Sequence, residues 1–194
     1  MALTAKGRAT RQRIIEGAAA YLRRDGPAEV TLDDIRAITG TSKGQIFHYF
    51  PDGKEELLLA VARHEADQVL VDQRPHLSAL TSWAAWDRWR DSVVARYRAQ
   101  GQNCPLGALM GQVGSTPGAA AVVSTLLAQW QGEIRRGIAG MQEAGLVRSG
   151  IDGDRVSGAF VAGIQGGVQV LRSTGSTEQL EALLDTLIDH LRGA

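Results

Sequence analysis

Apolar residues recur along this chain of 194 residues at intervals of three and four positions, which is the period of an amphipathic α-helix. The first such segment covers about residues 8–24. A second segment of barely two turns covers residues 32–39, and a third follows over residues 43–50. No stretch alternates apolar and polar residues at the period of a β-strand. The pattern therefore predicts an all-α fold.

Beyond residue 54 the predicted helices become longer. Pro75 is expected to interrupt the chain after the first of them. The expected ranges are about 54–71, 82–99, 105–113, 119–144, 154–172 and 177–191. About nine helices are therefore expected in all. We divide them into a three-helix amino-terminal domain at residues 1–54 and a larger helical domain at residues 55–194.

The two short helices are separated by a tight turn that contains Gly40. With a longer helix before them, they predict a helix-turn-helix, the motif that places its second helix in the major groove of DNA. Thr31 is the expected N-cap of the first short helix, and Thr41 or Ser42 that of the second. The first turn of the second helix is then expected to meet the edges of the bases.

The residues in that first turn suit contact with DNA. The amide of Gln45 can pair with adenine, and Lys43 with guanine or a phosphate. Gly44 removes a side chain where backbone and DNA would otherwise collide. An alternative for Gln45 is that it closes a capping box with Ser42 and is bound to the start of its own helix.

Four large side chains follow in a chain that is otherwise poor in aromatic residues. Consecutive helical residues point about 100° apart, so Phe47, His48, Tyr49 and Phe50 cannot all face one core. Ile46 and Phe50 lie four residues apart and are the expected inward pair. We therefore expect His48 and Tyr49 to face DNA, with Phe47 partly in the core.

Charge is unevenly distributed, although the formal net charge is zero. Residues 1–54 hold nine of the 21 Lys and Arg but six of the 21 Asp and Glu. A modestly basic start joined to an acidic remainder suits a DNA-binding domain followed by a domain with another task.

Composition also limits the cellular setting. The single cysteine excludes an internal disulfide and a cysteine-rich zinc site. No run of about 18 apolar residues is long enough to span a membrane, and the start lacks the apolar stretch of a secretory signal. We expect a cytoplasmic protein that does not contact membranes.

The segment TLDDIRAITGTSKGQIFHYFPDGKEELLLAV resembles the DNA-binding segment of the TetR family of bacterial transcriptional regulators. The resemblance implies a homodimeric repressor of palindromic double-stranded operator DNA, released when a small-molecule effector fills the second domain. By similarity, Thr31 and Lys54 would hold phosphates at the two ends of the motif. Phe47 stands where the family commonly has Tyr, which leaves van der Waals contact. Residues 104–107, CPLG, are similar to a segment in one subgroup of the family.

The last two predicted helices are the expected dimer contact. Mid-helix glycines cost roughly 1 kcal/mol each, and the close approach of a partner helix would explain them. The alternative is a close contact between helices of the same chain. The expected interface residues are Phe160, Gly163, Ile164, Gly167, Leu171, Leu184, Leu187 and Ile188.

Aromatic residues in the second domain are candidates for an effector pocket, which is typically apolar with a few polar groups. They favour an apolar or aromatic ligand, and the alternative is that they are simply core. The candidate lining residues are Trp83, Trp86, Trp89, Tyr97, Met110 and Trp130.

An enzyme is not expected. No metal-ligand spacing and no phosphate-binding glycine loop occurs, so we expect no metal, no cofactor and no catalytic residue. Cys104 precedes Pro105 at a predicted helix start, but no histidine has a recognisable spacing to it. Its remaining functional alternative is a redox switch in which oxidation of Cys104 replaces ligand binding. A buried, inert thiol is the third possibility.

Overall fold

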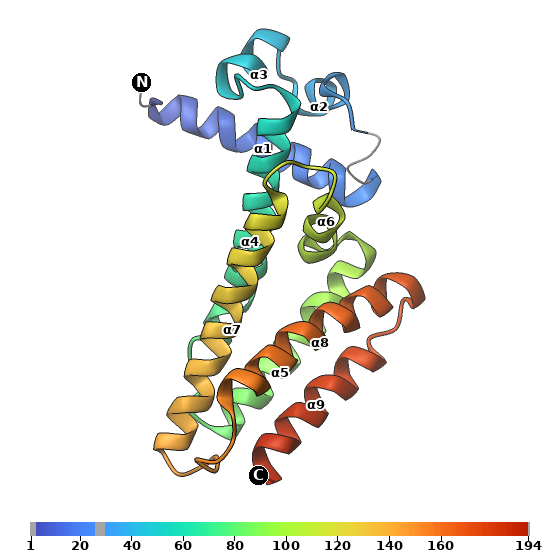
Figure 1. Ribbon diagram of the computed structural model, residues 1–194. Helices are drawn as coiled ribbons and strands as arrows, with labels where there is room; N and C mark the ends of the chain where they lie inside the picture. The colour runs from blue at the N-terminus through green and yellow to red at the C-terminus, as the bar shows by residue number, and fades with distance from the viewer. Residues whose placement is uncertain (1–2, 26–29, 194) are drawn as a thin grey trace. The chain divides into compact units, whose positions relative to one another are not determined.

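The computed structural model describes residues 3–25 and 30–193 of the chain (Figure 1). Within those residues it contains nine α-helices, one 3-10 turn and no strand, which confirms the predicted all-α fold. The helices are α1 (Ala5–Asp25), α2 (Leu32–Thr39), α3 (Lys43–Tyr49), α4 (Lys54–Leu77), α5 (Trp83–Gln100), α6 (Pro105–Gln112), α7 (Ala119–Glu143), α8 (Gly153–Thr174) and α9 (Glu178–Gly193), with the 3-10 turn η1 (Gly101–Asn103) between α5 and α6.

The chain forms two compact units. The first comprises the described residues of 1–68 together with 105–123, and so contains α1 to α3, most of α4, and α6. The second comprises 69–104 and the described residues of 124–194, and so contains α5, most of α7, α8 and α9. The domain boundary predicted after residue 54 stays a prediction.

Helix α2 begins at a capping box, as the order of residues in its first turn suggests. The hydroxyl of Thr31 accepts a hydrogen bond from the amide of Asp34 at 3.2 Å, and the Asp34 carboxylate accepts one from the amide of Thr31 at 2.9 Å. These two bonds satisfy two amides at the helix start, which fixes where α2 begins. The pKa of Asp34 is lowered, first by a hydrogen bond that the hydroxyl of Thr31 donates to the carboxylate and then by the bond from the amide of Thr31.

The core cluster of the first unit is built from apolar residues of α1, α2, α3 and α4 and of the segments beside them. Ile46 and Phe50 are almost completely buried, which confirms them as the inward pair of the third helix. Gly17 of α1 faces Thr39 of α2 so closely that a side chain there would collide with the threonine methyl group. The other buried members are Ile14, Ile15, Ala18, Ala19, Leu22, Val30, Ile35, Leu57, Leu58, Ala60 and Val61.

A buried ion pair joins α1 to α4. Nη1 of Arg23 lies 2.9 and 3.0 Å from the two carboxylate oxygens of Glu65. The side chain of Glu65 is fully buried, whereas that of Arg23 is 25% exposed. A buried carboxylate is costly unless it is paired, so this contact ties α1 to α4 strongly.

Aromatic rings form the centre of the second unit. Trp86 and Trp89 of α5 both contact Phe160 of α8, with ring centroids 5.5 and 5.7 Å apart. All three side chains are fully buried. Their edge-to-face and tilted contacts are the geometries that aromatic pairs prefer. Phe160 was expected at a dimer interface, and it is instead part of this core.

Helices α8 and α9 run antiparallel, side by side (Figure 1). A Cβ atom added at Gly167 would lie 3.0 Å from the backbone of Leu180, and one added at Gly163 would collide with Leu183. These two glycines therefore serve a contact within the chain. Ile164, Leu171, Leu184 and Ile188 are buried within the chain, so these expected interface residues have little surface to offer a second copy.

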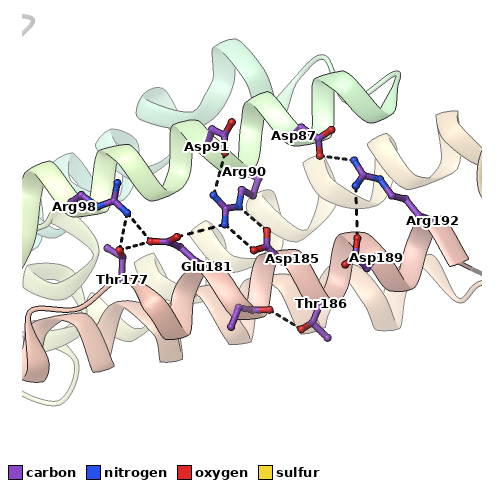
Figure 2. A network of polar contacts seen from close by, with 11 residues as sticks. Asp87, Arg90, Asp91, Arg98, Thr177, Glu181, Asp185, Thr186, Asp189 and Arg192 are labelled. Atoms are coloured by element: carbon purple, nitrogen blue, oxygen red, sulfur yellow. Dashed lines mark hydrogen bonds and ion pairs between the residues drawn. The ribbon is translucent and has the colours of Figure 1, made fainter.

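Charged side chains join α5 to α9 in the network drawn in Figure 2. Arg90 donates two hydrogen bonds to the carboxylate of Asp185, at 2.7 and 2.8 Å. Arg98 donates to Glu181 at 2.7 Å, and Glu181 also accepts a hydrogen bond from Thr177. The bond to Asp185 is the main cause of a raised pKa at Arg90, and the bond from Thr177 the main cause of a lowered pKa at Glu181. One exposed pair stabilises little, but the network sets how α9 lies along α5.

Helix α4 continues through Pro75, contrary to the expected interruption. Proline lacks the N–H that would bond to the carbonyl of Val71, so one helical hydrogen bond is lost. The loss falls in the last turn, and the amide of Ser78 again bonds to the carbonyl of Arg74 at 3.1 Å. Leu77, just beyond the proline, is almost completely buried, and its packing supports the final turn.

Candidate nucleic-acid interface

Helices α2 and α3 are joined by a turn with glycine in the left-handed conformation. Gly40 has φ 58°, and its N–H bonds to the carbonyl of Arg36. Within the turn the hydroxyl of Thr41 lies 2.9 Å from that of Thr39, and both residues are buried. The side chain of Thr41 is thus enclosed by the protein, so the DNA contact predicted for it is not available in this conformation.

Helix α3 leaves a continuous polar face exposed. Ser42, Lys43, Gly44, Gln45 and His48 are all on the surface of the first unit. A side chain added at Gly44 would meet nothing within 4 Å. Packing within the chain therefore does not explain this glycine, which costs helix stability. The backbone of α3 is open at this position.

Gln45 forms a capping box with Ser42, which was the alternative to contact with a base. Its side-chain oxygen accepts a hydrogen bond from the amide of Ser42 at 3.0 Å, and the Ser42 hydroxyl accepts one from the amide of Gln45 at 3.2 Å. This second capping box determines where α3 begins. To pair with adenine, Gln45 would have to release the amide of Ser42.

The aromatic residues at the end of α3 divide between core and surface. Phe47 is 41% exposed and His48 is exposed. Tyr49 is half-buried, and its ring packs against the core of the first unit. The ring of His48 lies edge-on to that of Tyr49, with centroids 4.8 Å apart. His48 and Phe47 are therefore the outward pair, and Tyr49 is held by packing on one side.

The two predicted phosphate anchors lie at opposite ends of the motif. Thr31 is exposed, and its hydroxyl is hydrogen-bonded to the carboxylate of Asp34. Lys54 is the first residue of α4 and follows Gly53, whose φ is 71°. Arg11 of α1 adds a cation near the end of α3, with its guanidinium carbon 4.9 Å from the centre of the Phe50 ring. The sequence alone does not show that Arg11 lies beside Phe50.

The candidate effector residues of the second unit are mostly interior. Trp86, Trp89 and Trp130 are fully buried. The indole N–H of Trp89 donates to Gln73 at 3.2 Å. The indole N–H groups of Trp86 and Trp130 have no hydrogen-bond partner among the described residues. A buried donor without a partner is unfavourable, so both positions could accommodate an acceptor.

The remaining candidates, Trp83, Met110 and Tyr97, differ in their exposure. Trp83 is partly exposed beneath the guanidinium of Arg192, 5.3 Å from its ring centre. Met110 belongs to the first unit and is 37% exposed. Tyr97 is almost completely buried, and this burial, with a smaller effect of the Cys104 thiol, raises its pKa.

Cys104 is fully buried. Oxidation of a thiol requires access and thiolate character, and an apolar interior provides neither. No observation therefore favours a redox switch at this residue. In the described part of the chain no group of three or more His, Cys, Asp or Glu could hold a metal ion. No helix there is long and apolar enough to cross a membrane.

Two sequence families match this chain. The family described as "Bacterial regulatory proteins, tetR family" matches residues 14–61, and the one described as "Tetracyclin repressor-like, C-terminal domain" matches residues 82–187. The second match alone covers more than half of the chain. The fold and the α2–α3 motif define a helix-turn-helix transcriptional regulator. The chain belongs to the TetR family of bacterial regulatory proteins.

Curated relatives match part of the chain. The "Uncharacterized HTH-type transcriptional regulator TtgW" of Pseudomonas putida is 35% identical over 81 residues, which are 42% of this chain and 60% of that protein. The "HTH-type transcriptional repressor AcnR" of Corynebacterium efficiens is 44% identical over 57 residues, 29% of this chain and 30% of that one. The chain thus matches less than two thirds of the length of either relative. Both are described as transcriptional regulators rather than enzymes.

Solved structures match over the whole length. A TetR transcriptional regulator from Chloroflexus aurantiacus has a TM-score of 0.79 at 24% identity, with 96% of each chain covered. A TetR-family regulator from Cytophaga hutchinsonii has a TM-score of 0.80 at 19% identity, covering 99% of this chain and 98% of that one. At these identities the likeness establishes the fold.

Proposed function

We propose that this protein is a homodimeric repressor that binds a palindromic operator through α2 and α3. A small apolar or aromatic ligand bound in the second unit releases it from DNA. The observation that carries the proposal is the exposed face of α3, where Lys43 and His48 flank a glycine without a structural role inside the chain. A lysine and an open backbone at the start of the second helix, with an exposed imidazole one turn later, suit contact with the major groove.

A binding titration tests the DNA-binding role. Duplex DNA from the region upstream of the protein's own gene is titrated from low to moderate salt, with a shuffled duplex of the same composition as control. We expect the protein to prefer the upstream duplex. The logarithm of its binding constant is expected to fall linearly with the logarithm of the salt concentration. Weak binding that does not distinguish the two duplexes at any salt would contradict the proposal.

The proposed ligand carries a hydrogen-bond acceptor on an apolar or aromatic body. Support comes from the unpartnered, fully buried indole N–H groups of Trp86 and Trp130. An acceptor that reaches either of them removes the cost of a buried donor, about 1–3 kcal/mol. A ligand of the same shape without an acceptor would gain no such advantage.

Substitution of Trp130 by phenylalanine separates a ligand contact from a core contact. In the native protein we expect ligands with an acceptor to bind about 10-fold or more tightly than ligands without one. Trp130→Phe is expected to abolish this preference, because the indole N–H donor is gone. The measurement is the ligand-induced rise in melting temperature across pairs of aromatic compounds with and without a carbonyl group. Trp86→Phe tests the second donor in the same way.

Trp89→Phe is the matched control, because the indole of Trp89 already donates to Gln73. It is expected to lower the melting temperature of the free protein without changing which ligands bind. If all three variants behave alike, the tryptophans are core only and the ligand proposal fails at these residues.

The proposed dimer uses the face of α8 that the α9 contact leaves open. Ala162 and Gly166 lie one turn apart and are exposed. A side chain at Gly166 would meet nothing within 4 Å, unlike those at Gly163 and Gly167. Leu187 of α9, which is half-buried, lines a neighbouring groove of about 600 Å³ and remains available to a partner. Close approach of the same helix from a second copy would explain Gly166.

Arginine at Gly166 is expected to convert a dimer to a monomer, because its bulk and charge would lie where the two copies of α8 approach. The measurement is molar mass by light scattering or sedimentation. Gly140→Arg is the matched control, since Gly140 is also helical, exposed and without a neighbour within 4 Å. Both changes replace glycine with a better helix former, so neither is expected to unfold the monomer. A Gly166→Arg protein with the molar mass of the Gly140→Arg control would contradict this interface.

A further inference from the structure

Arg36 of α2 lies beside α3 and forms an ion pair within its own helix. Nη1 of Arg36 forms an ion pair with Asp33, one turn earlier on α2. The Nε atom of Arg36 is buried and has no hydrogen-bond partner among the described residues. The side chain as a whole is 38% exposed, and that of Asp33 is 83% exposed. One donor of this guanidinium is thus unsatisfied while another is bound to an exposed carboxylate.

Arg36 lines a groove between α2 and α3. The groove has a volume of about 240 Å³, room for several water-sized groups. Its other lining residues include Lys43 and Phe47, which belong to the exposed face of α3. Two cations therefore converge on one groove, with Asp33 as the acidic group that lines it. Such a pair of cations is an anion site once the carboxylate is displaced.

We propose that Arg36 binds a phosphate of the DNA backbone. In the free protein Asp33 pairs with Arg36 and so competes with that phosphate. The inference rests on the proposed DNA-binding function and extends its interface from α3 to α2. The guanidinium offers several donors in a planar fork, which matches two phosphate oxygens better than the single Nη1 contact to Asp33. Asp33 competes with the DNA phosphate for the guanidinium of Arg36. The pair therefore lowers affinity for all DNA and makes binding depend more on the contacts of α3.

The test is a double-substitution cycle on DNA affinity with Arg36→Ala, Asp33→Asn and the two together. We expect Arg36→Ala to weaken binding about 5- to 20-fold on the preferred and the shuffled duplex alike, and to reduce the salt slope by about 1. Asp33→Asn is expected to tighten binding about 3- to 10-fold in the native background. In the Arg36→Ala background the same change is expected to alter affinity less than 2-fold, because the residue it restrained is gone.

Two results would overturn the proposal. One is an Arg36→Ala protein with native affinity and native salt slope. The other is an equal gain from Asp33→Asn in both backgrounds, which would mean that Asp33 only repels DNA and restrains nothing. Arg136→Ala is the matched control, since Arg136 of α7 is an exposed arginine paired at the same spacing with Glu133. It is expected to bind DNA as the native protein does.

The cycle also distinguishes this proposal from the function on which it rests. If the native protein does not discriminate between the two duplexes, the DNA-binding function itself has failed. If the native protein discriminates and Lys43→Ala weakens binding while Arg36→Ala does not, the function stands and only the role of Arg36 is wrong.

Discussion

Replacing Arg23 with methionine is expected to lower the free energy of unfolding by about 3–5 kcal/mol. The carboxylate of Glu65 is fully buried, and the substitution removes the guanidinium that lies 2.9 and 3.0 Å from its two oxygens. Methionine keeps an unbranched apolar side chain, so the loss reports the charge rather than the packing of the stem. Chemical denaturation followed by circular dichroism measures it.

Two comparisons make this prediction specific. The double substitution Arg23→Met with Glu65→Leu is expected to recover most of the loss, because no uncompensated charge remains. Arg135→Met removes an exposed arginine that lies 3.5 Å from Asp154, and is expected to change stability by less than about 1 kcal/mol. A small loss for Arg23→Met, equal to that control, would mean that the buried pair contributes little.

The start of α2, its end and the start of α3 could be predicted from the sequence because the contacts that set them are local. Thr31 and Ser42 each form a capping box with a residue three positions later. Gly40 ends α2 in the left-handed conformation. Each of these structures involves atoms within a few residues of one another, so short sequence patterns contain what is needed.

Contacts between distant residues could not be predicted in the same way. The small residues of α8 indicated a close helix approach, but the sequence did not say which helix approaches. Two of the three glycines at the centre of α8, Gly163 and Gly167, serve α9 of the same chain, and only Gly166 remains for a partner. The pairing of Arg23 with Glu65 joins residues 42 positions apart and has no sequence signature.

The candidate DNA-binding face was predicted in outline because helical geometry forces neighbouring side chains apart. That argument correctly placed Ile46 and Phe50 inward and left His48 outward. It did not foresee that Tyr49 packs against the core or that Thr41 is enclosed by its turn. Both depend on how closely α2 and α3 approach, which only three-dimensional packing determines.

Removing the two outward polar side chains of α3 is expected to have the largest effect on DNA binding. Each base or phosphate contact contributes about 1–3 kcal/mol, so Lys43→Ala with His48→Ala is expected to cost about 2–4 kcal/mol. That cost raises Kd for the preferred duplex roughly 30- to 700-fold. Both side chains are exposed, and neither makes a hydrogen bond or ion pair in the described part of the chain, so the melting temperature is expected to stay close to native.

The same titration separates the loss of charge from the loss of sequence selectivity. Loss of the lysine charge is expected to reduce the salt slope by about 1, because one fewer counterion is released. The matched control is Arg136→Ala with His76→Ala, which removes one cation and one imidazole from the second unit. Equal affinities for the two double variants would mean that α3 does not contact DNA. A loss of affinity that occurs only in the α3 variant, and is greater for the preferred than for the shuffled duplex, would mean that these residues supply sequence selectivity as well as charge. Loss of a phosphate contact alone lowers the affinity for both duplexes equally.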